Sequence, residues 1–517
     1  MRVEFGGDKI FNAFLIKILV LKATLTYDKG TIVIRGLAHI PFAVLDPRTN
    51  VLRALALYYS NIIEYLKQSG IEYSDHVLSE ETMMLSLSLS SSSALSLRDY
   101  QHRALDNWLR AGLRGCVVLP TGSGKTIIGI KAIEKSNAAS LVVVPTLDLM
   151  DQWTTTLSKY FSNIRIGNLG GGNDDIQSIT VSTYDSAYIR APFLGNKFSL
   201  IIFDEVHHLA AVGYRTIAEQ MAAPFRLGLT ATIEREDDLH KDLPRLVGEV
   251  VFQVSPDELA RDKHLASYEI ERRTVEMLPD ELEEYRRHMS IYQQCMKKLN
   301  FQRYAISLEK LIIMSGRNRT AREALLARNK AMNVALNSRA KIEELREILA
   351  ENKGAKTIIF TQHNSLVHEI SDKFLIPLIT HKTIKEERQD VLKGFKEGRY
   401  MAIVTSKVLD EGVDIPDAEL GIILSGTGSA REFIQRLGRL LRPKPGDNSG
   451  SNSSSTNGVK HYKKAKLIEI ISSETKETIT SARRKRALKI MHSSNNNNNN
   501  YDHSKEEKRV EGEYRNI

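Results

Sequence analysis

Cysteine is almost absent from this chain of 517 residues, which contains only Cys116 and Cys295. The two are far apart and have no His or Cys neighbours at metal-ligand spacing, so neither a disulfide framework nor a zinc module is supported. We therefore expect a reducing intracellular compartment.

Long apolar runs are also lacking. The longest near the N-terminus, residues 10–25, is interrupted by Asn12, Lys17 and Lys22 and has no small-residue cleavage site. We expect neither a signal peptide nor a membrane span, and no membrane partner.

The chain has no large excess of one charge, since 72 Lys and Arg oppose 63 Asp and Glu, a net charge of +9. The bias is concentrated in residues 297–341, where Lys and Arg far outnumber Asp and Glu. Crowded like charges destabilise a helix unless a polyanion is near. Contact with nucleic acid and a solvated helix face therefore both remain possible interpretations of this segment.

The length predicts two to four domains, and 42% hydrophobic residues predict ample core. From residue 97 to about 254, short apolar runs such as LVVVP and SLIIFDE alternate with longer amphipathic segments, and the pattern recurs from about 341 to 471. This is typical of parallel strands joined by helical crossovers, and it predicts two doubly wound α/β domains. Between them, apolar residues over 278–349 recur every three or four positions, which predicts helices.

The first 80 residues combine a strand-like stretch, 31–37, with a helix-like one, 51–68, and predict a small α+β domain. The expected organisation is an N-terminal α+β domain 1–84, a Ser-rich linker 85–96, a first α/β domain 97–254, a basic helical insertion 255–340, a second α/β domain 341–490 with a disordered loop at about 446–459, and a disordered tail 491–517.

A phosphate-binding loop is indicated by LPTGSGKT, residues 119–126, between an apolar strand and an amphipathic helix. Glycines let the backbone curl so that several N–H groups face phosphate oxygens. Leu119 replaces the first Gly of the strict pattern, but the rest of the motif is intact. Lys125 is expected to neutralise the β and γ phosphates and Thr126 to bind Mg²⁺. The nucleotide-binding set is Thr121, Gly122, Ser123, Gly124, Lys125 and Thr126.

Two carboxylates follow the strand SLIIF, at the sheet edge where open α/β sheets bind ligands. Asp204 suits Mg²⁺ coordination, and Glu205 can orient and deprotonate an attacking water. A helix N-terminal cap is the alternative, which the upstream phosphate loop makes weaker. The adjacent His207 and His208 do not share a face, so no metal site is expected there; His207 is expected to be a polar link, and His208 has no assigned role.

The order of LPTGSGKT, DEVH at 204–207, LTAT at 229–232 and QRLGRLLR at 435–442 resembles superfamily 2 helicases, whose two RecA-like domains bind ATP between them. The LRDYQ entry at 97–101, the triplet Arg235, Glu236 and Asp237, and the helical insertion resemble the XPB family of DNA-repair helicases in its archaeal form. The resemblance implies an ATP-dependent 3′-5′ DNA helicase of nucleotide excision repair or transcription, a cytoplasmic location, and a damage-recognition-like N-terminal domain.

Residue roles follow from the same resemblance. Gln101 would read adenine, Gly412 and Asp414 would contact ribose, and Gly228–Thr232 would couple nucleotide state to the nucleic-acid track. The coupling set is His207, Thr230, Ala231 and Thr232. By this resemblance, the expected nucleic-acid contacts are Thr146, Thr183, Thr405, Arg235, Glu236 and Asp237. The positive charge of residues 297–341 adds Arg317, Arg319 and Arg322 as expected contacts, with a solvated helix face as the alternative. For the three threonines, hydroxyls that cap helices or end strands are the rival interpretation.

In the second domain, Gln435 can position water or the γ-phosphate, and Arg439 and Arg442, three apart on one helix face, can stabilise phosphoryl charge. The run at 482–489 is open between nuclear targeting and contact with nucleic acid or a partner. The expected partners are single-stranded, forked or duplex DNA and a protein such as a repair nuclease. Two alternatives remain: an ATP-switched DNA clamp or scaffold, and an RNA helicase, because motor cores contact mainly phosphates.

Overall fold

A computed structural model describes residues 22–79, 96–161, 163–235, 237–261, 268–299, 308–406, 418–424, 465–475 and 477. The chain forms two compact units whose main division falls between Gln253 and Val254. The expected linker 85–96 lies outside the described residues except Ser96, and the expected loop 446–459 and tail 491–517 lie wholly outside them. Within the described part, no helix combines the length and hydropathy needed to span a membrane.

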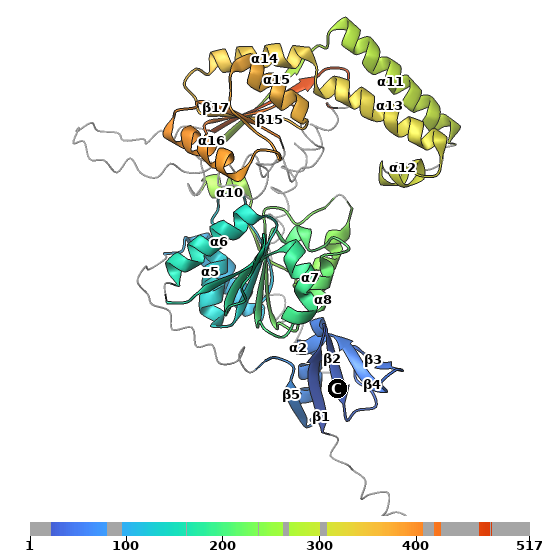
Figure 1. The fold of residues 1–517 in the computed structure, drawn as a ribbon, viewed down its shortest axis with the longest axis vertical. Helices are drawn as coiled ribbons and strands as arrows, with labels where there is room; N and C mark the ends of the chain where they lie inside the picture. The colour runs from blue at the N-terminus through green and yellow to red at the C-terminus, as the bar shows by residue number, and fades with distance from the viewer. Residues whose placement is uncertain are drawn as a thin grey trace, which may run out of the picture. The chain divides into compact units, whose positions relative to one another are not determined.

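The N-terminal domain is a five-stranded sheet covered by one long helix, as the α+β prediction required (Figure 1). The strand order is β3-β4-β2-β1-β5. Its elements are β1 (Ala23–Asp28), β2 (Thr31–Arg35), β3 (Ala43–Asp46), β4 (Val51–Leu55), a 3₁₀ turn (Ala56–Tyr58), α2 (Tyr59–Gln68) and β5 (Tyr73–His76).

The predicted helix over 51–68 is wrong in its first five residues, which form β4. Burial alternates along β4, with Leu52 and Ala54 turned into the domain core. This period of two is the pattern of a strand with one buried face, and pairing with β2 and β3 outweighs the helical preference of Leu and Ala.

The first α/β domain contains an eight-stranded sheet of order β13-β6-β12-β11-β7-β10-β8-β9, parallel except for the β8–β9 pair. Figure 1 shows α5 and α6 on one face and α7 and α8 on the other. The strands are β6 (Arg114–Val118), β7 (Ser140–Val144), β8 (Ile166–Gly170), β9 (Asn173–Asp174), β10 (Ile179–Thr183), β11 (Leu200–Asp204), β12 (Phe225–Thr230) and β13 (Val250–Gln253). The helices are α4 (Asp99–Arg110), α5 (Lys125–Ser136), α6 (Leu147–Tyr160), α7 (Tyr184–Leu194), α8 (Arg215–Glu219) and α9 (Leu243–Leu246), with 3₁₀ turns η2 (Val206–His208) and η3 (Leu239–Asp242). Strands β7, β10 and β11 are buried along their whole length, as expected when helices cover both faces of a parallel sheet.

The N-terminal domain packs on this sheet domain through a small apolar and polar interface. The Tyr27 hydroxyl lies 3.0 Å from the carbonyl oxygens of both Pro192 and Gln220. Leu57 lies in the apolar core of the sheet domain, and Ala222 lies in the core of the N-terminal domain. Each domain therefore contributes a side chain to the apolar core of the other.

The second α/β domain contains a six-stranded parallel sheet of order β14-β19-β18-β15-β17-β16. Its strands are β14 (Tyr268–Val275), β15 (Thr357–Phe360), β16 (Leu378–Ile379), β17 (Ala402–Thr405), β18 (Leu420–Ile423) and β19 (Ala465–Ser472). Its helices are α14 (Arg339–Glu351), α15 (Asn364–Phe374) and α16 (Lys385–Glu397), while α10 (Pro256–Arg261) precedes β14.

The helical insertion is shorter than the predicted 255–340, because Tyr268–Val275 is a strand of the second sheet. Strand β14 pairs in parallel with β19 over its full length. The segment is charged, YEIERRTV, and its local sequence pattern does not predict a strand partner so far away in the chain. The insertion proper consists of α11 (Pro279–Lys298), α12 (Leu308–Ser315) and α13 (Arg319–Leu336), which confirms the helical prediction. Helix α13 presents a buried alanine stripe, which includes Ala324 and Ala331, and these small side chains permit close packing with α11 and α12.

Candidate active site

The phosphate-binding loop has the backbone that its glycines predict. Strand β6 ends at Val118 and α5 begins at Lys125. Gly122 has a φ of 81° and Gly124 a φ of 80°, in the left-handed region that a side chain disfavours. The loop therefore delivers the N-terminus of α5, where backbone N–H groups favour an anion, to the carboxyl edge of the sheet.

Gln101 lies against this loop. It is buried in α4, its Nε2 lies 3.4 Å from the Gly124 carbonyl oxygen, and a Cβ on Gly124 would come within 2.7 Å of that nitrogen. Its Oε1 accepts the backbone N–H of Arg98 at 2.9 Å. The amide is thus placed beside the phosphate loop, and adenine recognition by Gln101 stays a prediction.

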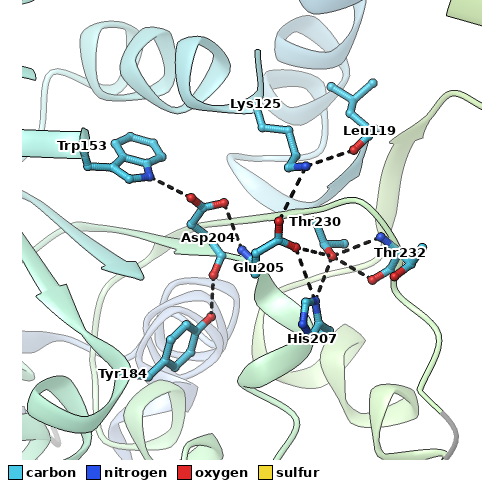
Figure 2. Close-up of polar contacts among 9 residues, drawn as sticks. All are labelled: Leu119, Lys125, Trp153, Tyr184, Asp204, Glu205, His207, Thr230 and Thr232. Atoms are coloured by element: carbon cyan, nitrogen blue, oxygen red, sulfur yellow. Dashed lines mark hydrogen bonds and ion pairs between the residues drawn. The ribbon is translucent and has the colours of Figure 1, made fainter. Parts of the chain in front are cut away.

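Asp204 ends β11 with its carboxylate buried and held on both oxygens (Figure 2). The Trp153 indole Nε1 donates to Oδ2 at 2.8 Å, and the backbone N–H of Glu205 donates to Oδ1 at 3.0 Å. Tyr184 donates its hydroxyl to the Asp204 carbonyl oxygen at 3.1 Å. Burial, followed by the neighbouring Glu205 charge, raises the pKa of Asp204 above its usual value. A divalent cation at this position would favour the ionised carboxylate.

Glu205 faces the lysine of the phosphate loop. Lys125 Nζ lies 3.8 Å from Glu205 Oε1 and donates to the Leu119 carbonyl oxygen at 3.2 Å. Glu205 has a φ of 46°, a left-handed conformation that costs a non-glycine residue about 1–3 kcal/mol. The surrounding contacts hold this strained backbone and aim the carboxylate at the ammonium group.

The predicted coupling residues meet at Glu205. The Thr230 hydroxyl oxygen lies 3.2 Å from Glu205 Oε2 and 3.1 Å from His207 Nδ1, and it donates to the Thr232 carbonyl oxygen at 2.7 Å. Ala231 is buried between the two threonines. Strands β11 and β12 are paired neighbours, which is how residues of two separate motifs come into contact. Their role in coupling stays a prediction.

Arg235 is directed at the same cluster. Its Nη1 donates to the His207 carbonyl oxygen at 2.8 Å, while Nε and Nη2 bind Asp237 at 2.9 and 2.6 Å. This pairing lowers the pKa of Asp237 to about 2. The expected nucleic-acid role of Arg235 and Asp237 stays a prediction, and Glu236 lies outside the described residues.

The threonines expected at the nucleic-acid track have identifiable local partners. Thr146 caps α6 by accepting the Leu149 backbone N–H at 3.3 Å, and Thr183 caps α7 by accepting that of Ser186 at 3.2 Å. Thr405 is buried and donates to the Ser406 carbonyl oxygen at 2.9 Å. The capping interpretation therefore holds for the first two, and contact with a nucleic-acid backbone stays a prediction for all three.

Of the insertion arginines, Arg317 lies in the turn between α12 and α13, and Arg319 and Arg322 lie in the first turn of α13. Arg317 and Arg319 are exposed, and so is Arg322, whose Nε donates to the Ser315 carbonyl oxygen at 3.1 Å. The remaining predicted site residues, Gly412, Asp414, Gln435, Arg439 and Arg442, lie outside the described residues.

Sequence reasoning missed Trp153 and Tyr184. Neither belongs to a motif that carries chemistry, and both lie in helices that cover the sheet, where an aromatic residue is expected to fill the core. The rarity of tryptophan in this chain, which has two, is the only signal that could have drawn attention to Trp153.

Three family models match this chain. They are the Xeroderma pigmentosum group B helicase damage recognition domain over residues 25–77, the res subunit of type III restriction enzymes over 94–235, and the helicase conserved C-terminal domain over 340–444. The matched ranges follow the N-terminal domain and the two sheet domains in order.

Among curated relatives, DNA 3′-5′ translocase XPB2 of Sulfurisphaera tokodaii is 41% identical over 466 residues, covering 89% of this chain and 99% of the relative. Putative DNA 3′-5′ helicase Rad25 of Haloarcula marismortui is 33% identical over 355 residues, 68% of this chain and 51% of its own length. DNA 3′-5′ helicase XPB of Kineococcus radiotolerans is 29% identical over 405 residues, 76% of this chain and 63% of the relative.

Proposed function

Because this chain belongs to the XPB family of superfamily 2 DNA helicases, we propose that it is an ATP-driven 3′-5′ DNA translocase that opens duplexes during DNA repair or transcription. The observation that supports this most directly is the cluster at the carboxyl edge of the first sheet, where Lys125, Asp204 and Glu205 converge. Nucleotide excision repair is the process that the damage-recognition match favours.

The residues of this cluster suit distinct parts of ATP hydrolysis. Lys125, released from Glu205 and the Leu119 carbonyl, would neutralise the β and γ phosphates, which the N–H groups of Gly124 and the first turn of α5 would also bind. Glu205 would then be free to accept a proton from the attacking water.

The donor set at the site fits a magnesium ion. Asp204 supplies a carboxylate and Thr126 a hydroxyl, and oxygen ligands are what Mg²⁺ prefers in nucleotide sites. When bound, the ion would neutralise charge on the β and γ phosphate oxygens. Asp204 is already oriented for this by donors on both of its oxygens.

DNA contact is proposed for Thr146, Thr183 and Thr405 and for the exposed arginines of the helical insertion. Thr146 and Thr183 stand at the N-termini of α6 and α7, where backbone N–H groups favour a phosphate. Single-stranded, forked or duplex DNA is the proposed substrate, and a repair nuclease the proposed class of protein partner. Gln435, Arg439 and Arg442 are proposed to complete hydrolysis from the second domain.

A strand-displacement assay tests the proposal. Duplexes with a 3′ or a 5′ tail, made of DNA or of RNA, are incubated with the protein and ATP, with and without cell extract. We expect displacement of DNA from the 3′-tailed duplex. Preference for RNA would support the RNA-helicase alternative, while ATP-dependent binding without translocation or displacement would support the clamp.

A further inference from the structure

Trp153 makes a buried hydrogen bond to the carboxylate that the proposed function assigns to magnesium. Its indole Nε1 lies 2.8 Å from Asp204 Oδ2, and the two residues are 1% and 5% exposed. An indole N–H is a donor only, so the bond has one possible direction. Figure 2 shows the ring edge pointing at the carboxylate from the side opposite Lys125 and Glu205.

The indole itself is fixed by packing against the helix of the phosphate loop. A Cβ on Gly129 of α5 would lie 2.5 Å from the Trp153 ring carbon Cη2, so the absence of a side chain there makes room for the indole. Helix α6 supplies the tryptophan, α5 supplies the wall, and β11 supplies the acceptor. The donor is therefore held in place independently of the carboxylate.

The two hydrogen bonds orient the Asp204 carboxylate and leave acceptor sites on its oxygens. The Trp153 N–H occupies one lone pair of Oδ2, and the Glu205 N–H occupies one of Oδ1. Each oxygen of an ionised carboxylate has two acceptor sites, so one remains on each for a cation or for its bound water. The carboxylate cannot rotate without breaking both bonds.

We propose that Trp153 is a positioning residue for the magnesium ligand, one that fixes the orientation of the Asp204 carboxylate through its indole N–H. This inference rests on the proposed role of Asp204. It also connects the ligand to α6, because Trp153 lies about 10 Å along that helix from its capping residue Thr146.

The chain offers a matched control in its other tryptophan. Trp108 is also buried, and its Nε1 donates to the Arg226 carbonyl oxygen at 2.9 Å. Trp153→Phe and Trp108→Phe therefore each remove one buried indole N–H and retain an aromatic ring. Their effects on folding should be comparable, but only the first removes a bond to Asp204.

The experiment measures binding of a fluorescent ATP analogue while Mg²⁺ is titrated, for wild type and both variants, after thermal melts. Partners that orient metal ligands are worth about 10–100-fold in metal affinity, so Trp153→Phe should raise the Mg²⁺ midpoint by about tenfold or more. Trp108→Phe should leave it within about twofold of wild type. An unchanged midpoint in Trp153→Phe, or an equal shift in both variants, overturns the inference.

A second measurement does not require the Trp153→Phe protein. In Trp108→Phe, Trp153 is the remaining tryptophan, and its emission should change when Mg²⁺ and nucleotide are added together and not when nucleotide is added alone. Unchanged emission counts against the inference. If wild-type nucleotide binding proves independent of Mg²⁺, the proposed metal role of Asp204 fails, and the positioning role fails with it.

Discussion

Replacing Glu205 by Gln tests the division of labour in the active site. The amide is close to the carboxylate in size and shape but loses the charge that faces Lys125 Nζ at 3.8 Å. Asp204 and the phosphate loop keep their contacts. We therefore expect the variant to bind ATP and to hydrolyse it slowly.

The expected changes in nucleotide affinity and hydrolysis rate follow from the attraction between residues 125 and 205 and from the loss of the general base. At an effective dielectric constant of about 20, opposite charges at this distance attract by about 4 kcal/mol, and the substitution removes this restraint on Lys125. Nucleotide affinity should therefore stay equal to wild type or increase. General base catalysis contributes about 10²–10⁴-fold, so the hydrolysis rate should fall by that factor, which is about 3–5 kcal/mol of barrier.

The assay pairs DNA-stimulated ATP turnover with equilibrium binding of a fluorescent nucleotide. Glu134→Gln is the control, because Glu134 on α5 is ion-paired with Lys131 at 2.6 Å and takes no part in the proposed chemistry. Lys125→Ala provides the contrast, since it removes the charge that offsets the phosphates and should lose affinity. Turnover of the Glu205 variant within about threefold of wild type, or a loss of ATP binding equal to that of Lys125→Ala, would refute the reasoning.

Two further predictions concern DNA binding and domain packing. Replacing Arg317, Arg319 and Arg322 by Ala should flatten the dependence of log DNA affinity on log salt by up to about 0.7 per lost contact on single strands, while basal ATPase activity stays unchanged. Arg346→Ala is the control. An unaltered slope in the triple variant would support the interpretation of a solvated helix face. Burial raises the pKa of Tyr27 to about 12, so its contribution to stability is present below its ordinary pKa near 10 and is lost as pH rises towards 12. Tyr27→Phe should lower the free energy of unfolding by about 1 kcal/mol near neutral pH and by less at high pH. Denaturant unfolding of wild type and variant at both pH values measures this difference. A difference that does not depend on pH would contradict the prediction.

Much of the fold and the site could be predicted because their signals are local. The phosphate loop requires glycines at positions of positive φ, and Gly122 and Gly124 occupy them. Parallel strands buried on both faces read as short apolar runs, and SLIIFD, residues 199–204, carries its acidic residue to the expected sheet edge. Helices α11 and α13 follow from apolar periodicity alone.

Predictions failed where partners are distant in sequence. Val51–Leu55 is a strand because β2 and β3 flank it, and Tyr268–Val275 is a strand because β19, almost 200 residues later, pairs with it. Strand propensity depends on the neighbour that the sheet provides, and a short mixed segment does not identify that neighbour.

The motifs of the sequence determined which groups are available: Lys125 for phosphate, Asp204 for a cation and Glu205 for water. Only the tertiary structure decided how those groups are held, through the Trp153 bond to Asp204 and the Arg235 bond to the His207 carbonyl. The physical reason is that a motif reflects backbone constraints within a few residues, whereas the orientation of a buried carboxylate depends on donors that helix packing brings from elsewhere in the chain.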